Sequence, residues 1–199
     1  PKKETFHPAK VRLNEKYAID EPPTLLYIDK KKNIWAHHDN GTHFYDIKQQ
    51  KLTFFPIDGA LKEHGIDLAA IAEDRYGILF LYSNGNLERR SHQTNEITYR
   101  NTFLTNTNIP LHGKLSIYVD IDGDYWIYTK DSLYLYYTST DSWQQLSTRK
   151  DSHYVLSSNQ IKCVTQDARG HIWIATDHGG INIIDKTAHN IRTIRNDQS

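Results

Sequence analysis

Asp167-Ala-Arg-Gly170-His-Ile-Trp173 is the stretch that decides the fold, because its pattern recurs along the chain. An aspartate followed six residues later by an aromatic residue occurs four times: Asp29 and Trp35, Asp74 and Phe80, Asp120 and Trp126, Asp167 and Trp173. The aspartates lie 45, 46 and 47 residues apart. A period in this range indicates a repeat architecture in which each copy is one supersecondary unit.

Each unit reads as four short strands separated by turn-forming residues. Its apolar positions hold β-branched and aromatic residues, and no unit has apolar residues at the 3.6-residue spacing of a helix. The second strand of each unit is expected to open on the aromatic residue. The first strands are predicted at 25–28, 68–72, 115–119 and 161–165, the third at 42–47, 86–90, 133–137 and 181–185, and the fourth at 52–55, 97–99, 143–146 and 191–194.

Four strands at a period near 45 residues are typical of one β-propeller blade. We therefore predict an all-β chain of propeller blades, each a four-stranded antiparallel sheet, that forms a fragment of a larger propeller. The aspartates and aromatic residues are expected to be structural anchors, with the aromatic rings between neighbouring blades. The predicted domains are a lead-in or outer strand of a preceding blade at 1–23 and blades at 24–66, 67–112, 113–158 and 159–199.

The turn after each aspartate has its own signature. Glycine follows by three residues at Gly77, Gly123 and Gly170, where the hairpin is expected to need a positive φ. Lys32 takes this position in the first unit, so a turn of another type is expected there.

The alternating aspartates Asp120, Asp122 and Asp124 offer hard oxygen ligands of the kind that calcium prefers. Their spacing differs from an EF-hand loop, because glycine is fourth and the twelfth residue is Asp131. We interpret the segment as the ordinary turn between the first two strands. No metal is therefore expected at this segment.

Three histidines, His37, His38 and His43, also raise the question of a metal site. His37 and His38 would point to opposite faces of a strand and could not easily share an ion, so we expect exposed turn residues. The aspartate, glycine and aromatic pattern is similar to the Asp-box of sialidases, but no pair of convergent carboxylates marks a glycosidase. No metal, no cofactor and no catalytic residue is predicted.

Composition limits the classes of function that remain open. The 199 residues start with proline and contain no methionine, so we expect a piece of a longer protein. The 24 basic and 24 acidic residues cancel and give no electrostatic footprint for nucleic acid. No stretch has the roughly 18 apolar residues of a transmembrane helix, and no signal peptide is present. The single cysteine, Cys163, excludes an internal disulfide and is expected to be a buried strand residue.

The fourth unit, from Leu156 to Asp185, resembles the two-component regulator propeller repeat across about thirty positions. The other units keep the aspartate, the aromatic residue and the spacing, and the resemblance covers about residues 24–197. It implies the periplasmic sensor of a hybrid two-component histidine kinase of Bacteroides-type bacteria, which contacts the membrane only through a segment outside this sequence. It also implies an oligosaccharide ligand and no enzyme activity. The repeat motif is structural, so it transfers no ligand-binding residue.

Propeller geometry indicates where such a ligand would bind. Turns between the second and third strands and connections to the next blade gather on one face, and here they hold polar and aromatic groups suited to a sugar. An interaction propeller for a protein partner and an Asp-box-like glycosidase are the alternatives, and exposed sheet edges and faces favour self-association. The candidate ligand-binding residues are His37, His38, Asp39, Tyr82, Asn84, Lys130, Asp131, Arg149, Tyr154, Asp177 and His178.

Overall fold

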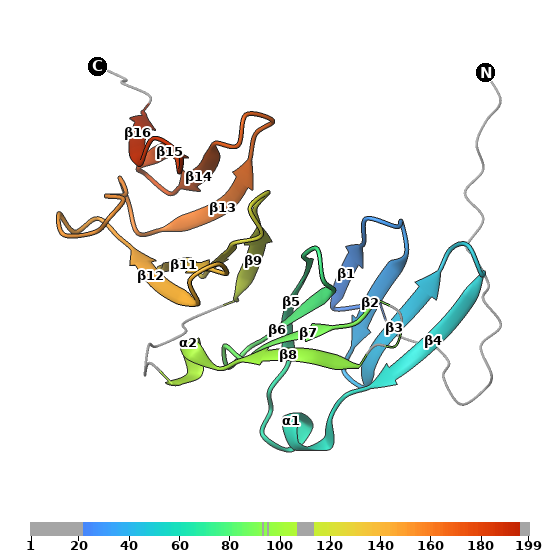
Figure 1. Ribbon diagram of the computed structural model, residues 1–199. Coiled ribbons are helices and arrows are strands. Elements are labelled where there is room, and N and C mark those ends of the chain that lie inside the picture. Colours follow the sequence, from blue (N-terminus) through green and yellow to red (C-terminus); the bar gives the residue numbers. More distant parts are fainter. Residues whose placement is uncertain (1–21, 93, 95, 107–113, 196–199) are drawn as a thin grey trace. The chain divides into compact units, whose positions relative to one another are not determined.

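The computed structural model describes residues 22–92, 94, 96–106 and 114–195. These residues form four antiparallel sheets of four strands, so the predicted all-β fold of propeller-type blades is confirmed (Figure 1). The chain divides into two compact units, residues 1–57 and 58–199. The predicted lead-in at 1–23 lies outside the described residues except for Pro22 and Pro23.

The first unit contains one sheet, and the second contains three. In all four, the strands follow one another in chain order, as in a meander. The first sheet comprises β1 (Leu25–Ile28), β2 (Ile34–His38), β3 (Gly41–Asp46) and β4 (Lys51–Pro56). The second comprises β5 (Leu68–Glu73), β6 (Ile78–Tyr82), β7 (Leu87–Arg90) and β8 (Ile97–Asn101). The third comprises β9 (Ser116–Val119), β10 (Tyr125–Tyr128), β11 (Leu133–Tyr137) and β12 (Ser142–Leu146), and the fourth β13 (Ile161–Gln166), β14 (Ile172–Thr176), β15 (Gly180–Asp185) and β16 (Asn190–Ile194).

The sixteen predicted strands are present, with ends shifted by at most two residues. The second strands do not open on the aromatic residue, because each begins one or two residues before it. Two helices were not expected: α1 (Gly59–Glu63) before the second sheet and α2 (Phe103–Asn106) after it. Helices of this length give no periodic pattern, and α1 depends on a local signal, the Asp58 carboxylate that accepts the Ala60 N–H. Neither described helix has the length and apolar character needed to cross a membrane.

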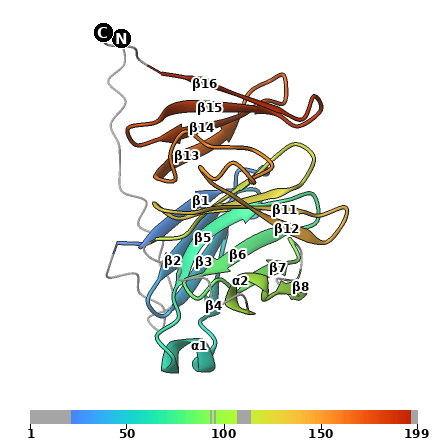
Figure 2. The same cartoon turned by 90° about the vertical axis from the view of Figure 1, so that its left-hand side faces the viewer.

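Two hydrophobic clusters join the three sheets of the second unit. One lies between the second and third sheets and includes Leu79, Leu81 and Tyr125. The other lies between the third and fourth sheets, which are stacked on each other in Figure 2. Trp126 is fully buried in this cluster, which also includes Ile172 and Ile174. Opposite faces of the third sheet therefore pack on different neighbours, as expected for stacked blades.

The second sheet departs from the pattern in its register. In the third sheet Tyr118, which lies two residues before Asp120, is opposite Trp126. In the second sheet Ala72, which lies two residues before Asp74, is opposite Leu79. Phe80 is opposite Ile71, one position further from the turn. The turn of the second sheet is one residue shorter. The Asp74 N–H donates to the carbonyl of Gly77, three residues later, whereas the Asp120 N–H donates to the carbonyl of Asp124, four residues later. A slip of one residue turns a side chain to the other face, so Leu79 takes the interface position that was predicted for Phe80.

The turn glycines also differ from the prediction. Gly123 and Gly170 have φ values of 86° and 88°, but Gly77 is not among the residues with positive φ. The different turn type predicted for the first unit is wrong as well: Lys32 adopts φ 69° and donates its N–H to the Asp29 carbonyl, as Gly123 does to that of Asp120. Glycine is needed at position 77 for close approach, because a Cβ there would lie 2.1 Å from the Arg90 carbonyl oxygen.

Gly77→Ala is therefore expected to destabilise the protein by about 1–3 kcal/mol, the range found for steric overpacking. The free energy of unfolding in urea measures this effect. Gly59→Ala is the matched control, since a Cβ at Gly59 has no atom within 4 Å, and it should be neutral or slightly stabilising in α1. Equal stability of the two variants would show that the backbone approach at Gly77 is not tight.

Candidate functional site

The repeated aspartate closes a hairpin turn in each sheet. In the first, third and fourth sheets its Oδ2 atom accepts a hydrogen bond from the indole Nε1 of the tryptophan six residues later, at 3.1 Å, 2.9 Å and 3.0 Å. Its Oδ1 atom accepts the backbone N–H four residues later, as Asp167 does from His171 at 3.0 Å. One carboxylate therefore holds the turn and orients the ring that follows.

These hydrogen bonds hold the pKa of the Asp167 carboxyl well below its ordinary value, with the bond from Trp173 as the largest cause. Trp173→Phe keeps a ring but removes the donor, so the carboxyl pKa should rise toward the ordinary 3.9 or so. Because folding lowers this pKa, the ionised carboxylate of Asp167 stabilises the fold at pH values above its unfolded-state pKa. This stabilisation disappears as pH falls through the folded-state pKa. A carbon-13 NMR titration of the carboxyl groups measures this, with Asp151, held by Arg149, as the internal control. An unchanged Asp167 titration would contradict the role of the indole.

The aspartates of the second and third sheets also accept a donor from the following sheet. Asp74 Oδ2 accepts Tyr125 Oη at 2.6 Å and Arg89 Nε at 2.7 Å, and Arg89 Nη2 donates to Tyr125 Oη at 2.7 Å. Asp74 is 4% exposed, so the carboxylate is buried but fully bonded. Burial, followed by the hydrogen bond to Asp74, raises the pKa of Tyr125.

The corresponding contact of the third sheet involves a lysine. Lys186, just after β15, places its Nζ atom 2.7 Å from Asp120 Oδ2, 2.8 Å from Asp122 Oδ2 and 2.7 Å from Asp124 Oδ2. We refer to Asp120, Asp122, Asp124 and Lys186 as the Lys186 cluster. Burial disfavours its charge, but the hydrogen bonds to the three carboxylates outweigh this effect and raise the pKa of Lys186.

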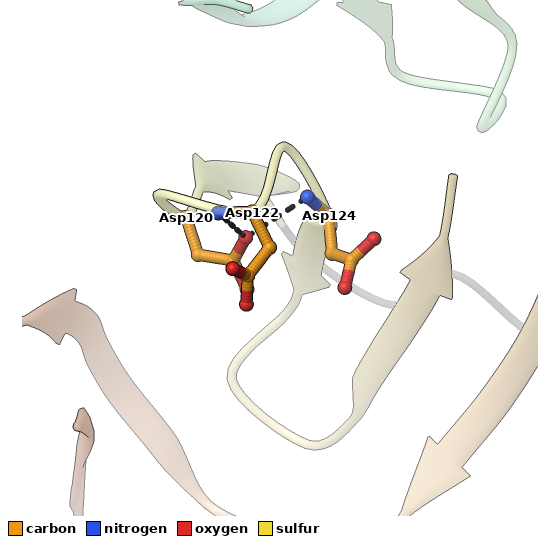
Figure 3. A group of neighbouring side chains, drawn as sticks. All are labelled: Asp120, Asp122 and Asp124. Carbon is orange, nitrogen blue, oxygen red and sulfur yellow. Dashed lines mark hydrogen bonds between the residues drawn. The ribbon is translucent and has the colours of Figure 1, made fainter. Parts of the chain in front are cut away.

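The three aspartates have the geometry of a cation site, since one oxygen of each lies within 4.8 Å of the others. Their carboxylates lie on the same side of the turn, and Asp120 Oδ1 accepts the N–H groups of Asp122 and Asp124 (Figure 3). The Lys186 ammonium supplies the positive charge that such a group of carboxylates requires. The arrangement thus joins the third sheet to the fourth.

The predicted ligand-binding residues fall into three groups by exposure. The exposed ones are Asp39, Lys130, Asp131, Arg149 and His178, and the half-buried ones are His38, Asn84 and Asp177. The buried ones are His37, Tyr82 and Tyr154. His37, His38 and Asp39 belong to the first compact unit, and the other eight belong to the second.

The buried members are part of the sheets and their cores. Tyr154 is 1% exposed inside the cluster between the third and fourth sheets. The Tyr82 hydroxyl donates to Glu88 at 3.1 Å, and His37 Nδ1 is 2.9 Å from Thr42 Oγ1. The expectation that His37 and His43 are exposed is wrong, because they are 5% and 6% exposed. Burial, and next the neighbouring His38, lower the pKa of His43.

Part of the predicted set does lie together along one edge of the third and fourth sheets. The Lys130 carbonyl accepts the Ile161 N–H at 2.9 Å, and the Gln160 carbonyl accepts the Asp177 N–H at 2.8 Å. Asp177 Oδ2 is 2.8 Å from Lys162 Nζ, and its Oδ1 is 3.2 Å from His178 Nδ1. We name this group the turn edge: Lys130, Asp131, Gln160, Lys162, Asp177 and His178.

Lys162 is the member that sequence reasoning missed. It lies where the β13–β14 register shifts between Ile161 and Cys163, and such a bulge re-aims a side chain. The sequence of β13 contains neither the glycine nor the proline that commonly marks a bulge, so it gives no local signal for one. The prediction for Cys163 is also wrong, since this cysteine is exposed.

Sheets of four meandering strands that recur at a regular period define a protein of the β-propeller class. Residues 155–178 match the family model described as two component regulator propeller, so the chain carries a repeat of this family and the predicted resemblance is confirmed. A comparison with curated protein sequences finds no match.

Solved structures share the fold at low sequence identity. The extracellular domain of BT3049 from B. thetaiotaomicron, assigned as a hybrid two component system, gives a TM-score of 0.60 with 18% identity over 85% of this chain and 22% of that one. Virginiamycin B lyase from Staphylococcus aureus gives 0.56 with 13% identity over 87% and 55%. PorZ from Porphyromonas gingivalis, a surface component of the type-IX secretion system, gives 0.51 with 15% identity over 98% and 30%. The chain therefore spans less than two thirds of each of these proteins.

Proposed function

We propose that this chain is part of the extracytoplasmic, periplasmic sensor of a hybrid two-component histidine kinase. The observation that carries the proposal is the regulator repeat at residues 155–178, which forms the start of the fourth sheet and supplies four of the six residues of the turn edge. Its role is recognition and not chemistry. The similarity to a lyase concerns the fold alone, and a fold hosts many unrelated functions.

The turn edge supports a polar, neutral ligand such as an oligosaccharide. It offers carboxylate acceptors on Asp131 and Asp177, ammonium donors on Lys130 and Lys162, and the imidazole of His178, whose side chain is 88% exposed. Hydroxyl groups of a sugar both donate and accept hydrogen bonds, so they can pair with both kinds of group. The acids and bases are paired with each other, which keeps the edge close to neutral.

A glycan array probed with this chain tests the proposal. Binding to one structural class of oligosaccharide, with the bound sugar recovered intact by mass spectrometry, is the expected result. Recovery of cleaved sugar would favour the glycosidase. A folded protein that binds no glycan on the array would exclude the oligosaccharide and leave the protein-interaction propeller.

A further inference from the structure

A polar residue lies in the apolar face between the third and fourth sheets. Asn182 of β15 has no exposure. It is directly opposite Ile174 of β14, and residues opposite each other in antiparallel strands share a face. Ile174 belongs to the cluster in which Trp126 is buried. Burial of an amide in such a place is costly unless the amide is hydrogen-bonded, so the partners of Asn182 decide what this position does.

Two hydrogen bonds join this amide to the connection between the third and fourth sheets. Its Oδ1 atom accepts the backbone N–H of Ser157 at 3.0 Å, and its Nδ2 atom donates to Ser157 Oγ at 2.9 Å. Oδ1 also accepts the hydroxyl of Thr193 on the neighbouring strand β16, at 3.1 Å. A backbone N–H can only donate, so the amide oxygen must face Ser157. Asn182 therefore has a fixed orientation and holds a residue 25 positions away in the sequence.

The segment that Asn182 holds leads directly into the turn edge. Shortly after Ser157, the Gln160 carbonyl accepts the N–H of Asp177, in the β14–β15 turn, at 2.8 Å. The next residue, Ile161, donates its N–H to the carbonyl of Lys130, in the β10–β11 turn, at 2.9 Å. One short segment is therefore bonded to both turns of the edge, one in the third sheet and one in the fourth.

The same segment packs tightly on the β14–β15 turn. A Cβ at Gly179 would lie 2.8 Å from Ser157 Oγ and 2.7 Å from Ser158 Cβ, so the segment and the turn approach each other as closely as a glycine permits. Ser158 Oγ accepts the N–H of Gln160 at 3.1 Å. A displacement of Ser157 would therefore move Gln160 and disturb the turn on which the segment packs.

The polar groups of the turn edge depend on where these turns lie. Asp177 is the acceptor for Lys162 Nζ at 2.8 Å and lies 3.2 Å from the imidazole of His178, so a shift of its turn changes both pairs. Asn182 itself has no exposure and cannot touch a molecule bound at the surface. Any influence of this amide on binding must therefore pass through the segment that it holds.

From these observations we infer that Asn182 is the positioning residue of the turn edge: its buried amide fixes residues 157–160, and these residues hold Lys130 and Asp177, from different sheets, as one binding surface. The consequence for binding rests on the proposed oligosaccharide sensor, whereas the positioning itself rests on hydrogen bonds within this chain. Loss of the amide frees the segment and lets the two turns move independently, without breaking either sheet.

Amide hydrogen exchange followed by NMR tests the positioning without a ligand. Asn182→Leu keeps the branched shape of the side chain but removes both bonds to Ser157. The amides of Asp177 and Ile161 should then exchange at least about tenfold faster, the effect of one lost hydrogen bond. The rates are taken relative to the amide of Gly170, which bonds to the Asp167 carbonyl at the other end of the sheet.

Two further variants complete the exchange experiment. Ser157→Ala removes only the bond from Asn182 Nδ2 and should speed exchange of the same two amides to a smaller extent. The matched control is Ile174→Val, which alters the residue opposite Asn182 on the same buried face and leaves the bonds to Ser157 in place. Its relative exchange rates should equal those of the wild type.

Calorimetry with an oligosaccharide found on the array extends the test to binding. Asn182→Leu should weaken its binding about tenfold, whereas Ile174→Val should bind like the wild type. Circular dichroism establishes that each variant is folded, and if Asn182→Leu is not, the result for Ser157→Ala decides. Faster exchange in Asn182→Leu together with a wild type that binds no glycan would reject the oligosaccharide and support the positioning role. Relative exchange rates that neither Asn182→Leu nor Ser157→Ala changes, or binding weakened equally by Asn182→Leu and Ile174→Val, would overturn the inference.

Discussion

Lys186→Met is expected to lower the free energy of unfolding by about 3 kcal/mol, because removal of one partner leaves buried carboxylates without their counter-charge. The side chain of Asp120 is 0% exposed and that of Asp124 is 8% exposed, so water can solvate neither carboxylate well. Asp122, at 58%, is solvated and contributes less. Urea unfolding followed by circular dichroism at neutral pH measures the loss.

Lys162→Met is the matched control for this prediction. Lys162 also makes a 2.8 Å ion pair in the fourth sheet, but its side chain is 61% exposed and that of Asp177 is 39% exposed. Exposed ion pairs contribute about 0–1 kcal/mol, so this variant should remain close to the wild type. Adding Asp124→Asn to Lys186→Met should recover part of the loss by removing one of the unopposed charges. Equal stability of the two lysine variants would show that the Lys186 cluster does not hold the sheets together.

Trp126→Ala is expected to cost about 3–5 kcal/mol, as large-to-small substitutions of buried aromatic residues do. The ring is fully buried between the third and fourth sheets, and its Nε1 atom donates to Asp120 at 2.9 Å. Its removal leaves a cavity in the interface and withdraws one of the hydrogen bonds of the turn. The midpoint of thermal unfolding should fall accordingly.

The comparison variant is Trp173→Ala, in the same repeat position of the fourth sheet. Trp173 is half-buried, whereas Trp126 has no exposure, and the Nε1 atom of Trp173 donates to Asp167 at 3.0 Å. Its truncation should therefore destabilise a monomeric sample clearly less than that of Trp126. If the two truncations proved equally costly, the interface position assigned to Trp126 would be wrong.

Local features of the fold could be predicted from the sequence. Alternating apolar residues and the aspartate and glycine turns locate the strands, because each of these signals acts within one hairpin. Trp126 is identified as an interface residue because a large aromatic residue at a fixed repeat position must be buried somewhere.

The register of the second sheet could not be predicted. Phe80 has the same spacing from its aspartate as Trp126, yet the turn after Asp74 is one residue shorter and Leu79 takes the interface position. The first unit illustrates the opposite case. Lys32 reads as a different turn but adopts the conformation of Gly123, since tertiary contacts can compensate the strain of a positive φ.

The candidate site was also predictable only in part, because some of its features follow from strand order and others depend on contacts between distant segments. Turn residues such as Lys130 and Asp177 follow from strand order alone, whereas the environment of Tyr154 depends on how a long connection folds back between two sheets. The partners of Lys186 lie 62 to 66 residues away in the sequence, so no local pattern could reveal them.

Calorimetric titration of the turn edge tests the proposed sensor function most directly. An oligosaccharide found on the array should bind the wild-type chain, and Lys162→Met and Asp177→Asn should each weaken binding about tenfold, the effect of one hydrogen bond to a charged group. Arg169→Ala should leave affinity unchanged, because Arg169 is exposed in the β13–β14 turn, at the other end of the sheet. Binding that is indifferent to Lys162 and Asp177, or that is lost with Arg169, would contradict the assignment of the turn edge as the ligand site.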